Sequence, residues 1–135
     1  MRLWHYELIP YLPQEMLVSQ WRELVAIKRQ WEKGTLKHRL VSYVKDYDKA
    51  YFCSYIVLVV TEMINRNINF NEKLYGELVN FCEKDSKIDF KEILYYPEHD
   101  NRYLRQCLYN LEEKFMRGII SKDDWEKIYM NIGIT

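Results

Sequence analysis

Hydrophobic residues recur at helical spacing through most of the chain. Between Pro13 and Gly34 the apolar positions fall on one helix face: Leu17, Trp21, Leu24, Val25 and Trp31. Proline suits the first position of a helix, and glycine suits the position just after its end. The pattern therefore predicts an amphipathic helix over 13–34. Thr35, just after that stop, is a suitable N-cap for a short second helical piece that ends near Tyr43.

The remaining chain shows the same periodicity. A long apolar helix is predicted over about 48–67. Its β-branched run at 56–61 is also compatible with a buried strand, but the length of the segment favours a helix. Three more helices are predicted, each opened by a residue type that caps helices: 72–81 behind Asn71, 100–117 from Asp100, and about 121–131 from Ser121.

Composition agrees with one helical domain. The 135 residues include only four glycines and three prolines, too few for the many tight turns of a β-sandwich or barrel. Residues 1–12 are aromatic and are interrupted by Pro10, which favours an extended arm. We therefore expect an all-α fold over residues 1–135: a single compact domain of about five to six helices, with an extended N-terminal arm threaded against them.

Charge is balanced over the whole chain but not along it. Lys and Arg number 20, and so do Asp and Glu, which argues against a strongly basic nucleic-acid-binding protein. Between Gln20 and Lys45, however, seven basic residues stand against two acidic ones. Such a segment suffices for a few phosphate contacts, which would make binding sensitive to salt. A solvated helix face is the commoner interpretation of the same charges.

Two features bear on location and cofactors. The longest uncharged run, 50–61, is about half as long as a membrane span, and the first residues do not form a signal peptide. The chain has three cysteines and no CxxC pair: Cys53, Cys82 and Cys107. We expect reduced thiols in a cytoplasmic protein and no membrane partner. Because no glycine-rich loop is present, we also expect no nucleotide cofactor.

The N-terminus carries the first candidate for chemistry. Arg2 is bulky enough to block removal of the initiator methionine, so the mature chain is expected to begin with the amine of Met1. An α-amino group has a pKa of roughly 7.7–8.0, well below that of lysine, so it can attack an aldehydic carbon near neutral pH. Most chain ends are frayed, but Leu3 and Trp4 are too apolar to stay loose in water.

Other candidates are less specific on their own. Arg22 and Glu23, on the first predicted helix, are adjacent charges of opposite sign, which is an ordinary surface pattern. Asp100 is the last residue of the segment 96–100 before a predicted helix. An N-cap role explains it at least as well as a catalytic role. The chain has three histidines: His5, His38 and His99. With Glu23 or Asp100 they are candidate metal ligands, but no spacing such as HExxH supports such a site.

Short motifs occur along the chain in a distinctive order: Arg2 directly behind the N-terminal residue, residues 21–24, 66–70 and 95–99, and the run 111–114. Together they resemble the pyrimidine-dimer DNA glycosylase family of phage endonuclease V-like proteins. The resemblance is stronger still to a bacterial branch of small proteins, which shares three motifs: residues 1–5, 8–13 and 96–100. It covers about 1–117.

The resemblance implies a mostly helical fold and a DNA repair enzyme, a glycosylase with AP lyase activity on damaged double-stranded DNA, without metal or other cofactor. In the family, the N-terminal amine attacks C1′ of the damaged nucleotide, expels the base and forms an imine. A glutamate then assists proton transfer and β-elimination of the strand. Here these groups are the amine of Met1 and the carboxylate of Glu23. Arg2 and Arg22 match phosphate-positioning arginines, and Lys114 matches a DNA-contacting lysine.

Two positions depart from the family, because Ala26 and Asn110 stand where it has DNA-contacting arginines. A second hypothesis is therefore a non-catalytic helical module that kept the scaffold and binds nucleic acid or protein. A third is a metal-dependent hydrolase that uses His5, His38 and His99. The same three histidines are further candidates for substrate binding in the glycosylase hypothesis. We expect a monomer.

Overall fold

The computed structural model describes residues 1–84 and 92–132. These residues form five α-helices and two short 3-10 helices, with no strand among them. In chain order the elements are η1 (Tyr6–Tyr11), α1 (Gln14–Lys33), η2 (Ser42–Asp46), α2 (Lys49–Asn65), α3 (Glu72–Glu83), α4 (Asn101–Met116) and α5 (Lys122–Asn131). The predicted all-α, single compact domain is confirmed.

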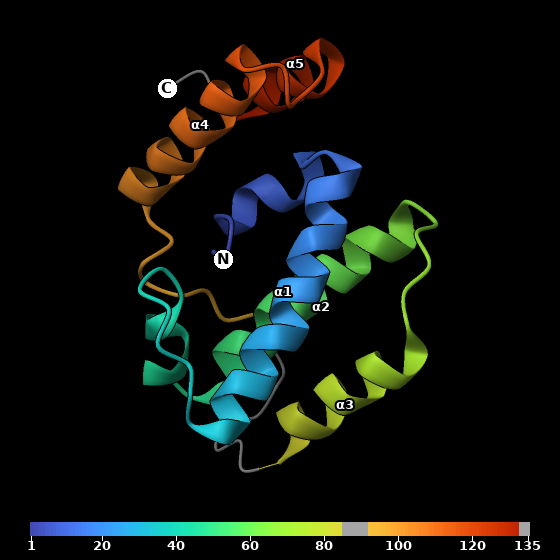
Figure 1. Cartoon of the computed structure of the whole chain (residues 1–135), viewed down its shortest axis with the longest axis vertical. Coiled ribbons are helices and arrows are strands. Elements are labelled where there is room, and N and C mark those ends of the chain that lie inside the picture. Colours follow the sequence, from blue (N-terminus) through green and yellow to red (C-terminus); the bar gives the residue numbers. More distant parts are fainter. Residues whose placement is uncertain (85–91, 133–135) are drawn as a thin grey trace.

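Helices α1 and α2 pack against each other at the centre of the molecule (Figure 1). Helix α3 contacts both of them. Helices α4 and α5 form a second pair, and α5 contacts η1. The N-terminal end of the chain lies between α1 and α4 (Figure 1). The first residues are therefore flanked by helices from both halves of the sequence.

Capping residues set most helix ends where the sequence predicts them. Four side chains accept hydrogen bonds from backbone N–H groups of the first helical turn: Asp48 from Ala50, Asn71 from Leu74, Asp100 from Tyr103, and Ser121 from Asp124. Gly34 ends α1 with φ 70°, a left-handed conformation that glycine adopts without strain. Pro13 is the residue before α1 rather than its first helical residue, one position away from the prediction.

The N-terminal arm is only partly extended. Residues 1–5 have no regular structure, but Tyr6–Tyr11 form η1, which begins where the N–H of Glu7 donates to Nδ1 of His5 (3.1 Å). Leu8 and Ile9 are both buried. In an extended strand two successive side chains point to opposite faces. The tighter turn allows both to enter the core, which is why the extended prediction fails there.

The short helix predicted over 35–43 does not form at that position. Residues 35–38 are irregular, and η2 begins only at Ser42. The buried anchors of this stretch are Leu36, Val41 and Val44. Their spacings of five and three do not repeat one helix face, so the chain turns twice instead of forming one regular helix.

The cysteine prediction is wrong for two of the three residues. Cys53 of α2 and Cys82 of α3 form a disulfide with a Cα–Cα distance of 5.8 Å, and Cys107 is a buried free thiol. A count and spacing of cysteines cannot reveal that α3 packs along α2 and brings the two together. The cytoplasmic location, which was argued from reduced thiols, stays a prediction.

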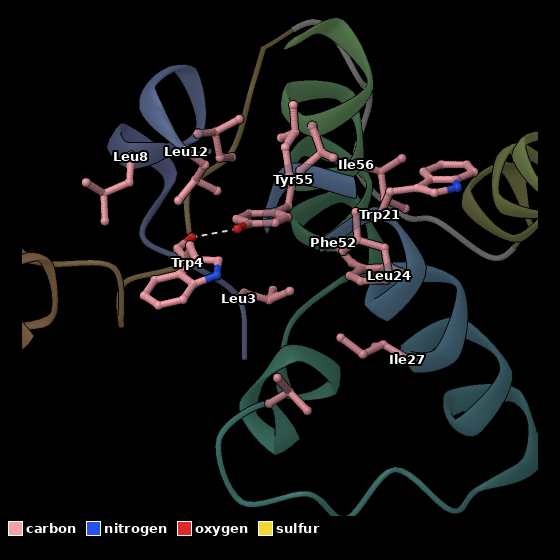
Figure 2. Close-up of a cluster of buried hydrophobic side chains, with 14 of the residues drawn as sticks. Leu3, Trp4, Leu8, Leu12, Trp21, Leu24, Ile27, Phe52, Tyr55 and Ile56 are labelled. Carbon is pink, nitrogen blue, oxygen red and sulfur yellow. Dashed lines mark hydrogen bonds between the residues drawn. The ribbon is translucent and has the colours of Figure 1, made fainter. Parts of the chain in front are cut away.

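The arm supplies part of the hydrophobic core (Figure 2). Leu3 and Trp4 lie beside side chains of α1 and α2 such as Leu24 and Tyr55, and Leu8 belongs to the same buried cluster. Leu3 is fully buried, as are Leu8 and Leu24. Burying a leucine side chain contributes about 1.5–3 kcal/mol. The interpretation of residues 3 and 4 as a frayed end is therefore excluded.

Helix α2 is the most deeply buried element, with Phe52, Val59 and Met63 fully inaccessible. None of the described helices, α2 included, combines the length and the apolarity needed to cross a membrane.

Candidate active site

A pocket of about 320 Å³ opens where the arm, α1 and α4 meet. Its lining combines residues from the first part of the chain with residues of α4 and the position after it: Met1, Arg2, Trp4, Glu23, Asn110, Glu113, Lys114 and Arg117. This volume is at the lower end of the range typical of small-ligand sites. Cationic groups outnumber carboxylates in the lining, so the pocket favours an anionic ligand.

The beginning of the chain is held directly against Glu23. The backbone N–H of Arg2 donates to Oε2 of Glu23 at 3.5 Å. The Gln20 side chain donates from Nε2 to the same carboxylate oxygen (3.1 Å) and to the backbone carbonyl of Arg2 (2.9 Å). Met1 is one peptide away and lines the same pocket as Glu23.

The helical repeat explains how α1 presents this arrangement. Gln20 and Glu23 are three residues apart, so their side chains lie on one face of the helix. The neighbouring positions Leu17 and Leu24 are fully buried, which draws Gln20 to 1% exposure, while Glu23 at the edge of the face stays half-buried. The helix thus delivers one buried amide and one accessible carboxylate to the arm.

The backbone of the arm is fixed at several points. The N–H of Trp4 donates to Oε1 of Gln20 (2.9 Å), and the hydroxyl of Tyr55 donates to the carbonyl of Trp4 (2.6 Å; Figure 2). The hydroxyl of Tyr103 in α4 donates to the carbonyl of Leu3. These bonds satisfy backbone groups that burial removes from water. They give the first residues one defined path.

Arg66 fixes the other end of the arm. Its guanidinium donates to the carbonyl of Leu12 (2.7 Å) and to the carbonyl of Pro10 (3.1 Å), and its Nε pairs with Glu62 at 2.7 Å. This arginine follows the last residue of α2, so it ties the start of α1 to the end of α2.

The Arg2 side chain lies inside the pocket wall. Its guanidinium carbon is 5.0 Å from the centre of the Trp4 ring, a cation–π geometry. Burial raises the pKa of the Cys107 thiol, and the nearby Arg2 cation opposes that shift. The Arg2 guanidinium is therefore close to α4 and is held by aromatic contact.

Helix α4 contributes one face to the pocket. Asn110, Glu113, Lys114 and Arg117 follow the spacing of three, four and seven residues that places side chains on one side of a helix. The Nη1 of Arg117 is 3.9 Å from Oε1 of Glu113, the distance of a weak surface ion pair. Lys114 is a site residue predicted from the sequence, whereas Glu113 and Arg117 are not. Their helical spacing from Lys114 was the available signal.

The other proposed site residues lie outside this pocket. His5 and His99 are buried, with 1% and 5% exposure, and their rings stack at 5.5 Å. Packing covers both rings in this structure, and their contact with substrate stays a prediction. His38 is exposed in the loop before η2, where its Nδ1 accepts from the N–H of Leu40 (3.3 Å). Arg22 is exposed on α1 and is not in the pocket lining.

The histidines also fail to form the metal site of the third hypothesis. Burial, with a smaller contribution from His5, lowers the pKa of His99 to about 3. The Nε2 of His99 is 2.7 Å from the Tyr43 hydroxyl. Over the described ranges, no three His, Cys, Asp or Glu side chains converge as metal ligands. The described residues therefore supply no set of metal ligands for a metal-dependent hydrolase.

Comparison with known proteins gives one family. A family model described as pyrimidine dimer DNA glycosylase matches residues 1–76, more than half of the 135-residue chain. The matched part contains the arm, α1 and α2, and hence Met1, Arg2, Gln20 and Glu23. Searches of curated proteins and of solved structures found no match. The chain belongs to the pyrimidine dimer DNA glycosylase family.

Proposed function

We propose that the protein removes damaged pyrimidines from double-stranded DNA and cleaves the strand at the resulting abasic site, with the amine of Met1 as nucleophile. The observation that carries the proposal is the contact between the Arg2 N–H and the Glu23 carboxylate at 3.5 Å. It supports an N-terminal amine that works beside an acid at the edge of an open pocket. No metal or other cofactor is needed for this chemistry.

The reaction divides into two bond exchanges. The Met1 nitrogen forms a bond to C1′ of the damaged nucleotide while the bond from C1′ to the base breaks, and the base leaves with a proton. The sugar ring then opens to give an imine. Removal of a proton from C2′ breaks the bond from C3′ to the phosphate oxygen, and water finally releases the amine. Glu23 is suited to move the protons in these steps and to stabilise the cationic imine.

The cationic groups fit a phosphate backbone. Arg2, Lys114 and Arg117 line the pocket, and Arg22 is exposed farther along the outer face of α1. Each cation that meets a phosphate adds to binding and to its salt dependence. In this proposal Arg2 and Lys114 position the sugar–phosphate at the amine, and Arg22 contacts the flanking duplex. A monomeric, cytoplasmic protein remains our prediction.

The proposal is tested by trapping the imine with borohydride on DNA that contains one abasic site. We expect the wild type to form a covalent adduct that peptide mapping assigns to Met1. Acetylation of the N-terminus is expected to abolish it, because an amide nitrogen is not a nucleophile. Glu23→Gln is expected to slow trapping by about 10²–10⁴-fold, because it removes a proton-transfer group.

Glu15→Gln is the matched control, because Glu15 is an exposed glutamate in the first turn of the same helix. It should leave trapping unchanged. Salt-sensitive DNA binding without any adduct, and without an effect of N-terminal acetylation, would instead support the non-catalytic module.

A further inference from the structure

Gln20 stands out as a buried polar side chain at the junction of the arm, α1 and α2. It is 1% exposed, and a buried amide is costly unless its groups are paired. Both N–H groups of the amide donate hydrogen bonds, and its oxygen accepts one from a backbone N–H. No role for this residue is predicted from the sequence.

The two ends of the amide hold different parts of the site. Oε1 accepts from the N–H of Trp4 at 2.9 Å and lies 3.0 Å from the Tyr55 hydroxyl. Nε2 donates to the carbonyl of Arg2 at 2.9 Å and to Oε2 of Glu23 at 3.1 Å. One planar group therefore fixes the arm on both sides of residue 3 and also orients the carboxylate.

We infer that Gln20 is a positioning residue that sets the register between the amine of Met1 and the carboxylate of Glu23. The inference rests on the proposed function, because it assigns Gln20 to that reaction. A nucleophile and a proton-transfer group act together only when both are held in a near-attack geometry, and a displacement of about 1 Å costs about 100-fold in rate. Gln20 is hydrogen-bonded both to the backbone next to Met1 and to the Glu23 carboxylate, so it sets the distance between the amine and the carboxylate.

The neutral amide also suits a carboxylate that gives and takes protons. The charged residues that line the pocket with Glu23 are Met1 and Arg2 from the arm, Glu113 and Lys114 from α4, and Arg117 at its C-cap. A lysine or arginine at position 20 would add another fixed charge beside the carboxylate. A glutamine donates one hydrogen bond and carries no charge, so it orients Glu23 without adding a cation.

The first test compares two substitutions at this position. Gln20→Met removes the hydrogen bonds to Trp4, Arg2 and Glu23 at similar side-chain length, and we expect imine trapping on abasic DNA to slow by about 100-fold. Gln20→Glu keeps acceptors for Trp4 and Tyr55 but cannot donate to Arg2 or Glu23, and we expect a loss of at least about tenfold. If circular dichroism shows that Gln20→Met does not fold, Gln20→Glu serves alone. Gln14→Met, an exposed glutamine on the same helix, is the matched control.

A double-mutant cycle separates positioning from general destabilisation. If Gln20 acts by positioning Glu23, its substitution should matter less once Glu23 is changed. In the Glu23→Gln background, Gln20→Met should slow imine trapping by at most about fivefold. Equal losses in the two backgrounds would overturn the inference. So would wild-type trapping rates in Gln20→Glu.

A readout that does not depend on catalysis keeps the two proposals apart. Exchange of the Trp4 backbone N–H with deuterium should become at least about tenfold faster in Gln20→Met, because that hydrogen bond is lost. Unchanged exchange would overturn the inference even if the wild type forms the adduct. A wild type that forms no adduct would overturn the proposed function alone, and the exchange rate would still test the link between Gln20 and the arm.

Discussion

At the scale of single residues, His99 is buried in a cluster of aromatic side chains. Its ring lies among Tyr43, Tyr96, Tyr103 and His5. Its Nδ1 is buried and has no hydrogen-bond partner among the residues that the structure describes. Burial first and His5 second lower its pKa to about 3, so the ring is neutral at physiological pH. A neutral, enclosed imidazole packs as an aromatic ring.

The buried histidine predicts a stability that falls with acidity. An unfolded histidine takes up a proton below a pKa of about 6.5, whereas folded His99 remains neutral down to about 3. The unfolded state therefore binds more protons between these values and is stabilised relative to the folded state as the pH falls. We expect His99 to lower the free energy of unfolding by about 2 kcal/mol at pH 5 relative to pH 7.

The measurement is urea unfolding at the two pH values. His99→Gln removes the titrating group, so it should reduce the difference between pH 7 and pH 5 by about that amount. His38→Gln changes an exposed histidine and should leave the difference as in the wild type. The same difference in all three proteins would contradict the assignment.

At the scale of elements, α3 is attached to the helical pair α1 and α2 by covalent and ionic links. The disulfide joins Cys82 of α3 to Cys53 of α2. On the other side, Glu77 is 3.8 Å from the buried Lys28 and 3.6 Å from Arg29, both on α1. These long-range links hold a short helix that buries few side chains of its own.

The disulfide predicts that stability depends on redox conditions. The bond spans a sequence separation of 29 residues, and loop-closure entropy for such a span amounts to about 3–4 kcal/mol. We expect Cys82→Ser to lower the free energy of unfolding by about that amount. Imine trapping should be retained under native conditions, because α3 contributes no residue to the pocket lining.

Urea unfolding with and without reductant checks this prediction. The reductant should destabilise the wild type and leave Cys82→Ser unaffected. Two free thiols at positions 53 and 82 in the protein purified without reductant, seen by mass spectrometry after alkylation, would contradict it.

At the scale of the whole molecule, charge distribution matters more than net charge. The chain is formally neutral, with 20 basic and 20 acidic residues. Folding brings Arg2 of the arm together with Lys114 and Arg117 of α4 at one pocket. A neutral protein thereby acquires a local site for an anionic ligand, which overall composition disfavoured.

Local charge predicts a measurable salt dependence of DNA binding. If Lys114 contacts one phosphate, Lys114→Ala should weaken binding to abasic DNA and reduce the slope of log K against log salt by about 0.9. Fluorescence anisotropy over a series of salt concentrations measures both. Lys73→Ala removes an exposed lysine of α3, outside the pocket lining, and should leave the slope unchanged. Equal slopes in all three proteins would remove Lys114 from the DNA contact.

The sequence by itself determined the α-helices and their ends. Side-chain periodicity and caps such as Asp48, Asn71 and Ser121 act within one or two turns, so they can be recognised in the sequence without knowledge of the tertiary structure. Met1, Arg2, Glu23 and Lys114, named from motifs, do line one pocket, but their roles stay predictions.

Only the tertiary structure decided which distant residues meet. Packing of α3 along α2 paired Cys53 with Cys82, although their count and spacing suggested free thiols. His5 and His99 are buried and do not line the pocket. The arm forms a 3-10 helix in which the successive residues Leu8 and Ile9 are both buried. Gln20 looks like an ordinary polar helix residue until the arm lies across it. Contacts between segments far apart in the chain depend on the geometry of packing, which no local pattern encodes.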